Sequence, residues 1–314
     1  MAEFKLKGFF DLSDNVFVGK SVSAILKSSA SRDALVTLFG RDNMPASVMR
    51  AKKATPTNDS DEIVHNGRGY TDTHIKTKYK KGSTLNKSFA VSGSGTKKGA
   101  LSTFPQNVGR TVLLLYTEPG MLVVDPFAGH NSRMELCITN GRHYEGCDLS
   151  TTFMEFNKRR ADHLRSIFKK SKLTLHHCDS RKMPVKDGVG DFTITSPPYY
   201  DIEEYGDEPA QLGKSKTYAK FLDGIGDVLK ENYRCLKPGA YAVWFVNDFK
   251  RRGIFHAYHL DLCTLAMAAG FKMHDIFIVD FGSCMGSIFI NQYIEHKLIP
   301  KQHEYGLVFQ KPIQ

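Results

Sequence analysis

The sequence has 314 residues, 41% of them hydrophobic, and a formal net charge of +10. This length and composition support one large domain, or one domain plus an accessory segment, with a full core. No apolar run reaches the roughly 18 residues that a membrane-spanning helix needs. Residues 1–100 hold 17 Lys and Arg against 9 Asp and Glu, so most of the excess positive charge lies there; it indicates a polyanionic partner or simply a basic surface.

The cysteines and the first residues indicate an intracellular, cytoplasmic protein without a bound metal. The six cysteines include no CxxC pair, which is typical of reduced thiols packed in a core. Acidic residues occur too early for a signal peptide. His176 to Asp179 are consecutive, and consecutive residues of a strand point to opposite faces, so they are not expected to share an ion.

Residues 1–103 are interpreted as a basic N-terminal region, followed by a second domain over 104–314. The pattern predicts one or two short helices between Ser21 and Phe39, then a polar and turn-rich stretch over 41–72. The segment 73–100 is rich in Lys and nearly devoid of apolar residues. It suits either a loop that orders on a phosphate backbone or a flexible linker.

From residue 104 onward, predicted strands alternate with predicted helices. Short apolar runs predict the strands, and longer stretches with a period near 3.6 predict the helices. The expected elements are helix 106–116, strand 121–125, helix 133–139, strand 143–147, helix 151–168, strand 173–176, strand 191–194, helix 218–235, strand 240–246, helix 256–269, and strands 276–279 and 306–309. This alternation predicts an α/β fold with a mainly parallel sheet covered by helices on both faces.

Polar residues follow the first four predicted strands. Asp125, Asp148, Asp179 and Ser196 all lie at or just beyond a carboxyl end, where open parallel sheets bind their ligands. Each aspartate alone could be a helix cap or a turn former. Their shared placement at four separate strand ends favours one binding site instead.

The turn after the first strand and the spacing of its acids predict a nucleoside ligand. Gly129 lets the backbone approach a ligand, and Asn131 tolerates a left-handed conformation. Asp148 follows Asp125 at about the 20-residue offset at which an acid binds ribose hydroxyls. The G-x-G-x-x-G pattern of dinucleotide sites is absent from the sequence, which argues against a nicotinamide cofactor.

The run Thr195-Ser196-Pro197-Pro198-Tyr199-Tyr200 follows the fourth strand. Two prolines cannot continue a sheet interior, so the chain leaves the sheet in an extended form with its carbonyls open. An aromatic ring stands directly behind them. Carbonyls that accept N–H bonds beside an aromatic ring suit a flat ligand that carries an amino group.

Together, Asp125-Pro126-Phe127-Ala128-Gly129 and the Thr195 to Tyr199 motif resemble the N4-cytosine/N6-adenine amino methyltransferases of DNA. The resemblance covers about residues 104–312 and includes Lys237-Pro238-Gly239 and the closing segment 303–309. It implies a Rossmann-like fold with a seven-stranded sheet whose last strand is antiparallel. It also implies S-adenosyl-L-methionine as the cofactor and a site-specific, S-adenosylmethionine-dependent DNA methyltransferase as the activity.

The resemblance assigns site residues by position. In this assignment Asp125 to Gly129 lie against the methionine part of the cofactor, Asp148 binds the ribose and Asp179 the adenine amino group. The full expected cofactor set is Phe104, Gln106, Asn107, Asp125, Pro126, Phe127, Gly129, Asn131, Asp148, Asp179, Ser180 and Thr195. The family usually has a second glycine and small hydroxyl residues after Gly129, whereas this chain has the run 130–133, His-Asn-Ser-Arg.

The resemblance makes Ser196, Pro197, Pro198 and Tyr199 the catalytic residues. The Ser196 side chain and the Pro197 carbonyl would accept the two amino protons, and Tyr199 would stack on a base that has left the duplex. A serine at the first motif position is commoner in N4-cytosine enzymes, and an aspartate in N6-adenine enzymes. No cysteine follows a proline in the sequence, which argues against C5-cytosine methylation.

The expected partner is double-stranded DNA, without a membrane. Residues 1–103 are the favoured target-reading region, and the insertions at 201–216 and 282–301 are alternatives. A homodimer and a partner restriction endonuclease both stay open. Two other functions also stay open: the same chemistry on RNA or on a protein amide, and a non-catalytic DNA-binding subunit on the same fold.

Overall fold

The computed structural model describes residues 39, 44–51, 104–202, 205–282 and 290–313. Most of the N-terminal region, with the helices expected before residue 40 and the Lys-rich segment, lies outside the described residues. The proposed division at residue 103 therefore stays a prediction. Among the described residues, no helix is both long and apolar enough to cross a bilayer.

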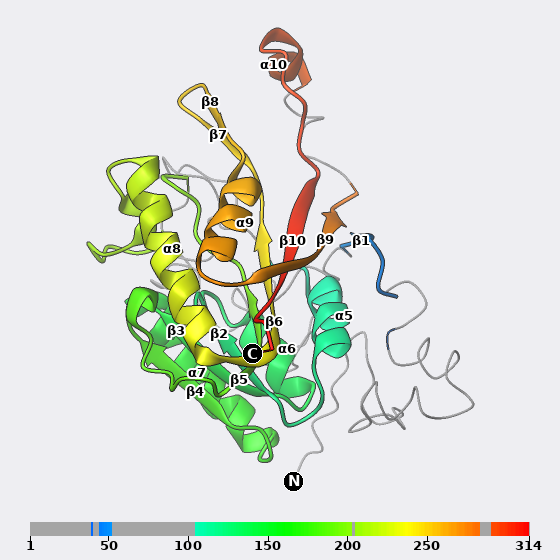
Figure 1. Cartoon of the computed structure of the whole chain (residues 1–314), viewed down its shortest axis with the longest axis vertical. Helices are drawn as coiled ribbons and strands as arrows, with labels where there is room; N and C mark the ends of the chain where they lie inside the picture. Colours follow the sequence, from blue (N-terminus) through cyan, green and yellow to red (C-terminus); the bar gives the residue numbers. More distant parts are fainter. Residues whose placement is uncertain (1–38, 40–43, 52–103, 203–204, 283–289, 314) are drawn as a thin grey trace, which may run out of the picture.

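An eight-stranded mixed sheet forms the centre of the described structure (Figure 1). Its strands, in spatial order, are β1 (Val48–Arg50), β9 (Lys272–Asp280), β10 (His303–Gln310), β6 (Leu236–Val246), β5 (Gly190–Thr195), β2 (Leu122–Asp125), β3 (His143–Asp148) and β4 (Leu173–His177). Only β10 runs antiparallel to its neighbours β6 and β9; the other pairs are parallel. The expected α/β fold with an antiparallel last strand is confirmed.

The sheet has one strand more than the seven expected. Val48–Arg50 pairs with Ile278, Val279 and Asp280 at the sheet edge, in a region interpreted from the sequence as polar and turn-rich. A three-residue edge strand is held by backbone hydrogen bonds, such as the one from Ala51 N–H to Asp280 O at 2.8 Å. Its side chains therefore carry no strong pattern, and sequence reasoning missed it.

Helices cover both faces of the sheet, as the strand pattern requires. The helices are α5 (Gln106–Tyr116), α6 (Ser132–Thr139), α7 (Thr151–Ile167), α8 (Tyr218–Cys235), α9 (Tyr258–Ala268) and α10 (Ile290–Glu295). Buried side chains of α5, α6 and α7 form one core with Val243 and Phe245 of β6. Those of α8 and α9 form a second core with Ala242 and Trp244 of the same strand. The alternation along β6 shows that it is buried on both faces.

A hairpin absent from the sequence interpretation follows β6. It consists of β7 (Phe249–Arg251) and β8 (Ile254–His256), which pair antiparallel across a two-residue turn. Figure 1 shows it projecting beyond the end of the sheet. The strands are too short for periodicity to reveal, and α9 begins at Tyr258, two residues after the helix start expected from the sequence.

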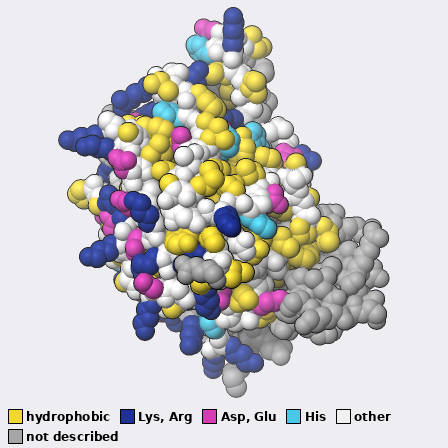
Figure 2. All heavy atoms as spheres, viewed as in Figure 1, with side chains coloured by type: hydrophobic (Ala, Val, Ile, Leu, Met, Phe, Trp, Pro, Cys, Tyr) yellow, Lys and Arg dark blue, Asp and Glu magenta, His cyan; other side chains and the backbone are white. Residues whose placement is uncertain are grey.

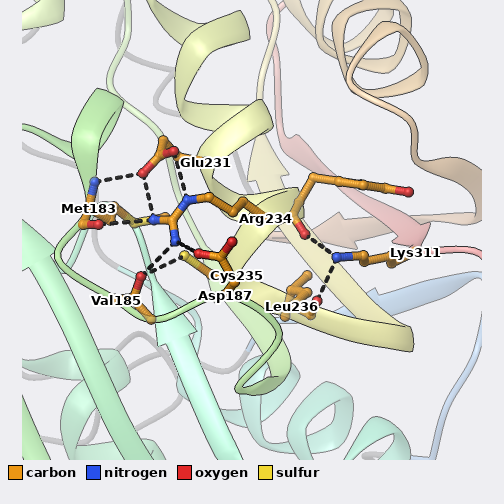
Figure 3. A network of polar contacts seen from close by, with 9 residues as sticks. Met183, Val185, Asp187, Glu231, Arg234, Cys235, Leu236 and Lys311 are labelled. Atoms are coloured by element: carbon orange, nitrogen blue, oxygen red, sulfur yellow. Dashed lines mark hydrogen bonds and ion pairs between the residues drawn. The ribbon is translucent and has the colours of Figure 1, made fainter.

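A network of polar contacts anchors the C-terminal end of α8 (Figure 3). Arg234 donates to Glu231 and Asp187 at 2.8 and 2.5 Å, and to the carbonyl oxygens of Met183 and Val185. Lys311 donates to the carbonyl oxygens of Tyr233 and Leu236. The 18 residues of α8 span about 27 Å, so this network fixes the helix at the opposite end from the predicted site.

Candidate functional site

The carboxylate of Asp125, at the end of β2, joins four elements and is fully buried. It accepts hydrogen bonds from Arg133 Nε at 2.7 Å, Tyr144 Oη at 2.8 Å and Thr195 Oγ1 at 2.6 Å. These partners come from α6, β3 and β5. Asp125 and Thr195 therefore do not line the cavity described below, and they fix the strand ends around it.

Arg133 brings a buried positive charge to the cavity wall. Its guanidinium donates to Asp125 and to the carbonyl oxygen of Phe127, and it lies 5.4 Å from the centre of the Phe104 ring. Burial lowers the pKa of this group, but the Asp125 carboxylate outweighs burial and raises it. No hydrogen bond within the described part of the chain engages Nη1. The sequence showed Arg133 only as a departure from the family pattern.

The turn after β2 is held tightly at Gly129, which has a φ of +49°. Its N–H donates to Asp148 Oδ2 at 2.6 Å, and its carbonyl accepts from Asn157 Nδ2 at 2.8 Å. Asn131 has a φ of −53° and donates to Glu135 at 2.6 Å. The expected left-handed conformation thus occurs at Gly129, as its missing Cβ allows, and not at Asn131.

His130 is a neutral wall residue. Its ring stacks on Phe156 with 4.8 Å between ring centres. Burial, reinforced by the nearby Arg133 charge, lowers its pKa to about 3. The imidazole is therefore uncharged at physiological pH, and it adds an aromatic surface to the turn.

Asp148, at the end of β3, faces the cavity with a partly buried carboxylate. One oxygen accepts from Gly129 N–H and the other from Ser150 N–H at 2.8 Å. A carboxylate has about four acceptor positions, so about two remain for a ligand. Burial raises the pKa of Asp148 to about 6, against the effect of these two backbone hydrogen bonds.

Asp179 lies on the same wall, one residue before the 3-10 turn Ser180–Lys182. It accepts from Arg181 N–H at 3.0 Å and pairs with the Arg181 guanidinium at 2.5 Å. Burial raises its pKa, but these hydrogen bonds outweigh burial and lower it. The Ser180 hydroxyl donates to the carbonyl oxygen of Pro126, which connects this turn to the one after β2.

Ser196, Pro197 and Pro198 form the opposite part of the lining, directly after β5. Tyr199 does not line the cavity. Its ring is 8% exposed and meets the rings of Phe249 and Tyr258 edge-on, each at 6.1 Å between centres. The aromatic ring therefore supports the proline loop from behind, as the motif suggested, without facing a ligand in this conformation.

Three expected cofactor residues precede β2: Phe104, Gln106 and Asn107. Of these, only Phe104 lines the cavity. Its ring packs against Phe245 with 4.9 Å between centres. Gln106 donates to the carbonyl oxygen of Ser132 at 2.7 Å, and Asn107 donates to that of Arg50 at 2.8 Å. These two amides hold α5 against its neighbours and do not line the cavity.

The cavity has about 1010 Å³ of empty space, counting its open mouth. This lies at the upper end of the range of roughly 300–1,000 Å³ for small-molecule sites. Lining residues that sequence reasoning did not assign are His130, Ser132, Arg133, Leu149, Phe153, Tyr205, Ala210, Gln211, Leu212, Val228 and Glu304. Leu149 directly follows Asp148, and Phe153 lies in the first turn of α7, so their positions beside a strand end were a usable signal.

Comparison with known proteins identifies a family. The N6/N4 methyltransferase family model, described as DNA methylase, matches residues 37–159 and 190–313. A search of curated proteins gives no match.

Three solved structures illustrate the similarity. A SAM-dependent methyltransferase from Methanosarcina mazei is 13% identical, with 65% of this chain and 98% of that chain covered and a TM-score of 0.45. TrmN from Thermus thermophilus is 16% identical, with coverages of 66% and 49% and a TM-score of 0.44. A proposed DNA modification methylase, also from Thermus thermophilus, is 24% identical, with coverages of 43% and 50% and a TM-score of 0.33.

Proposed function

The chain belongs to the N6/N4 DNA methylase family, and we propose that it methylates the exocyclic amino group of a base flipped out of duplex DNA, N4 of cytosine in preference to N6 of adenine. The family acts on DNA and uses S-adenosylmethionine. The observation that carries the proposal is the shared cavity. Ser196, Pro197 and Pro198 line it together with Asp148 and Asp179, so an amino-group acceptor and a nucleoside site adjoin.

The residues of the cavity fit the cofactor. The two remaining acceptor positions of Asp148 suit the two ribose hydroxyls, and Leu149 and Phe153 offer apolar surface to an adenine ring. Asp179 lines the same cavity as Leu149 and Phe153, and its carboxylate could accept a hydrogen bond from the adenine amino group. Arg133 presents a cation to the cavity, which suits the carboxylate of the methionine part.

The other expected cofactor residues are assigned a positioning role in this proposal. Asp125, Thr195, Gln106 and Asn131 have their side chains engaged within the protein. They hold the turn after β2 and the end of β5 in place, so that groups from both segments line the same cavity. Preorganisation of this kind lowers the entropy cost of bringing two reactants together.

When bound, S-adenosylmethionine supplies a methyl group on a positively charged sulfur. An exocyclic amino nitrogen is a poor nucleophile because its lone pair is shared with the ring. The Ser196 hydroxyl and the Pro197 carbonyl accept hydrogen bonds from the two amino protons and favour a tetrahedral nitrogen. Its lone pair is then localised on the nitrogen, within the cavity that would also hold the methyl donor.

Tyr199 supports this arrangement through the proline loop. The Tyr258 hydroxyl donates to the carbonyl oxygen of Pro198 at 3.4 Å, and Tyr199 packs against Tyr258 and Phe249. Stacking of Tyr199 on the base would require its ring to leave this buried cluster. We therefore assign it first to positioning of the loop.

The preference for cytosine rests on Ser196. A serine hydroxyl both donates and accepts, so it could also serve the ring nitrogen beside the amino group, which is N3 in cytosine and N1 in adenine. The slight preference for cytosine therefore comes from the family correlation of serine with N4-cytosine enzymes.

The experiment is a transfer assay with tritiated S-adenosylmethionine and three acceptors: duplex genomic DNA, total RNA and a protein extract. The proposal predicts label in DNA alone. Label in RNA or protein alone would support the alternative substrates, and cofactor binding without transfer to any acceptor would support a non-catalytic subunit.

A further inference from the structure

The β7–β8 hairpin combines exposed basic and exposed apolar side chains. Ile254 and Phe255 are 61% and 58% exposed, and the Arg252 side chain is 77% exposed. Lys250 is also exposed and stands opposite Phe255 in the register, on one face of the hairpin. The hairpin contains no acidic residue. Figure 2 shows hydrophobic and basic side chains together on the upper part of the molecule, where the hairpin lies.

We propose that this hairpin, Phe249–His256, is a DNA-binding element of the protein. In this proposal Lys250 and Arg252 contact phosphates, and Ile254 and Phe255 pack against bases beside the flipped nucleotide. The inference rests on the proposed function, because it concerns how the same DNA is held at the same site.

The turn of the hairpin supports a role for Arg252. Arg252 and Gly253 both have positive φ, +50° and +79°, as a two-residue hairpin turn of this type requires. Asn or Asp usually precedes the glycine in such turns, because these residues tolerate the left-handed region better than other non-glycine residues do. The exposed Arg252 side chain gains little packing against this strain, so its charge, which also pairs with Asp201 at 3.3 Å, is the property that the position uses.

The hairpin is attached to the catalytic loop. Asp201 lies three residues after Pro198. Its carboxylate pairs with Arg251 at 2.8 Å and with Arg252 at 3.3 Å. At the base of the hairpin, Phe249 packs on Tyr199 and His256 lies 6.4 Å from Tyr200, measured between ring centres. The tip, at Arg252, lies three residues beyond Phe249, which is about 10 Å along an extended strand. It therefore stands within the width of a DNA duplex from the loop that would hold the base.

The chemistry of the hairpin favours DNA over a protein partner. Protein interfaces are enriched in arginine and aromatic residues but depleted in lysine, whereas here Lys250 stands opposite Phe255 on one small projection. Lys301 adds a further cation 5.1 Å from the Phe255 ring. Proteins that bend or open DNA combine basic groups for the phosphates with apolar side chains that wedge between bases.

The test uses two double variants, Lys250→Ser/Arg252→Ser and Ile254→Ser/Phe255→Ser. The controls are Lys169→Ser/Lys170→Ser, which removes two exposed lysines just after α7, and Met267→Ser, which removes an exposed apolar side chain of α9. Arg251 is kept because it is the closer of the two arginines paired with Asp201, so one ion pair to the catalytic loop remains. Thermal unfolding and calorimetry with S-adenosylmethionine verify that each variant is folded and binds the cofactor.

Affinity is measured by anisotropy with a labelled duplex of mixed sequence, across a salt series, and methyl transfer with bulk genomic DNA. The basic variant is expected to lower the salt slope by about 1.8, since each phosphate contact contributes about 0.9. The apolar variant is expected to lose at least about tenfold in transfer with a smaller loss of affinity. Hairpin variants that match the controls in affinity, slope and transfer overturn the proposal. A wild-type protein that neither binds nor methylates DNA overturns the proposed function instead.

Discussion

The pKa of Asp148 gives the account a quantitative consequence for cofactor binding. In the proposed site, its carboxylate must be ionised to offer two acceptor positions to the ribose while it accepts from the N–H groups of Gly129 and Ser150. Burial raises its pKa to about 6, so the group is largely protonated at pH 5 and largely ionised at pH 7.5. The dissociation constant of S-adenosylmethionine should therefore rise about tenfold from pH 7.5 to pH 5 and be nearly constant above pH 7.

The perturbation is Asp148→Asn, which removes the titration and two acceptor positions. The amide nitrogen of the asparagine only donates, so it cannot accept the hydrogen bond from one of the two backbone N–H groups. Hydrogen bonds to charged groups contribute about 1.5–3 kcal/mol, so cofactor affinity at pH 7.5 should fall roughly 10- to 150-fold. The pH dependence below pH 7 should disappear. Asp162→Asn serves as the control, because that side chain is 76% exposed on α7.

The assay is calorimetry with S-adenosylmethionine between pH 5 and pH 8, with both variants and the wild type. Retention of the wild-type pH dependence in Asp148→Asn, or wild-type affinity at pH 7.5, would refute the assignment of Asp148 to the ribose.

Ionisation of the Asp148 carboxyl, which favours cofactor binding in this proposal, lowers the stability of the free protein. Its folded pKa of about 6 lies above the ordinary value of 3.8, so the folded state binds its proton more tightly than the unfolded state does. Its contribution to the free energy of unfolding is fully present below about pH 4 and is lost as pH rises to about 6. The difference in melting temperature between wild type and Asp148→Asn should change across this window and stay constant above it.

Three further predictions concern other parts of the molecule. Arg133→Lys keeps the charge beside Asp125 but loses the planar fork, so cofactor affinity by calorimetry should fall about tenfold; an unchanged affinity would remove Arg133 from the site. Arg234→Ala should lower the free energy of unfolding by about 1.5–3 kcal/mol in urea titrations and leave cofactor affinity unchanged, because its network lies at the far end of α8. Replacement of residues 53–102, which hold nine basic and four acidic residues, by a Gly/Ser linker should preserve cofactor binding and reduce DNA affinity at least tenfold, whereas retained affinity would reject the N-terminal region as a DNA-binding part.

The sheet and its strand ends could be predicted from the sequence because long amphipathic and apolar segments carry clear periods. The bounds of Gln106–Tyr116 and Tyr218–Cys235 agree with the helices predicted from the apolar pattern. Strands β1, β7 and β8 could not be predicted, since three residues are too few to show a period. The pairing of β1 depends on backbone groups of a strand far away in the chain.

The placement of polar residues at strand ends was predictable, but the direction of each side chain was not. Asp125 and Asp148 are the last residues of the neighbouring strands β2 and β3, yet only Asp148 lines the cavity. The difference arises from Arg133 and Tyr144, which come from other elements and surround Asp125. Tyr199 likewise depends on Phe249 and Tyr258, about 50 and 60 residues further along the chain.

Nucleoside analysis of methylated DNA tests the central claim most directly. Genomic DNA is incubated with the protein and S-adenosylmethionine that carries a deuterated methyl group, then digested to nucleosides and analysed by mass spectrometry. We predict label on N4 of deoxycytidine, and loss of that label when Ser196→Ala and Pro197→Ala are combined. Label on C5 of cytosine, or full labelling by the double variant, would contradict the assignment of the amino group to the proline loop.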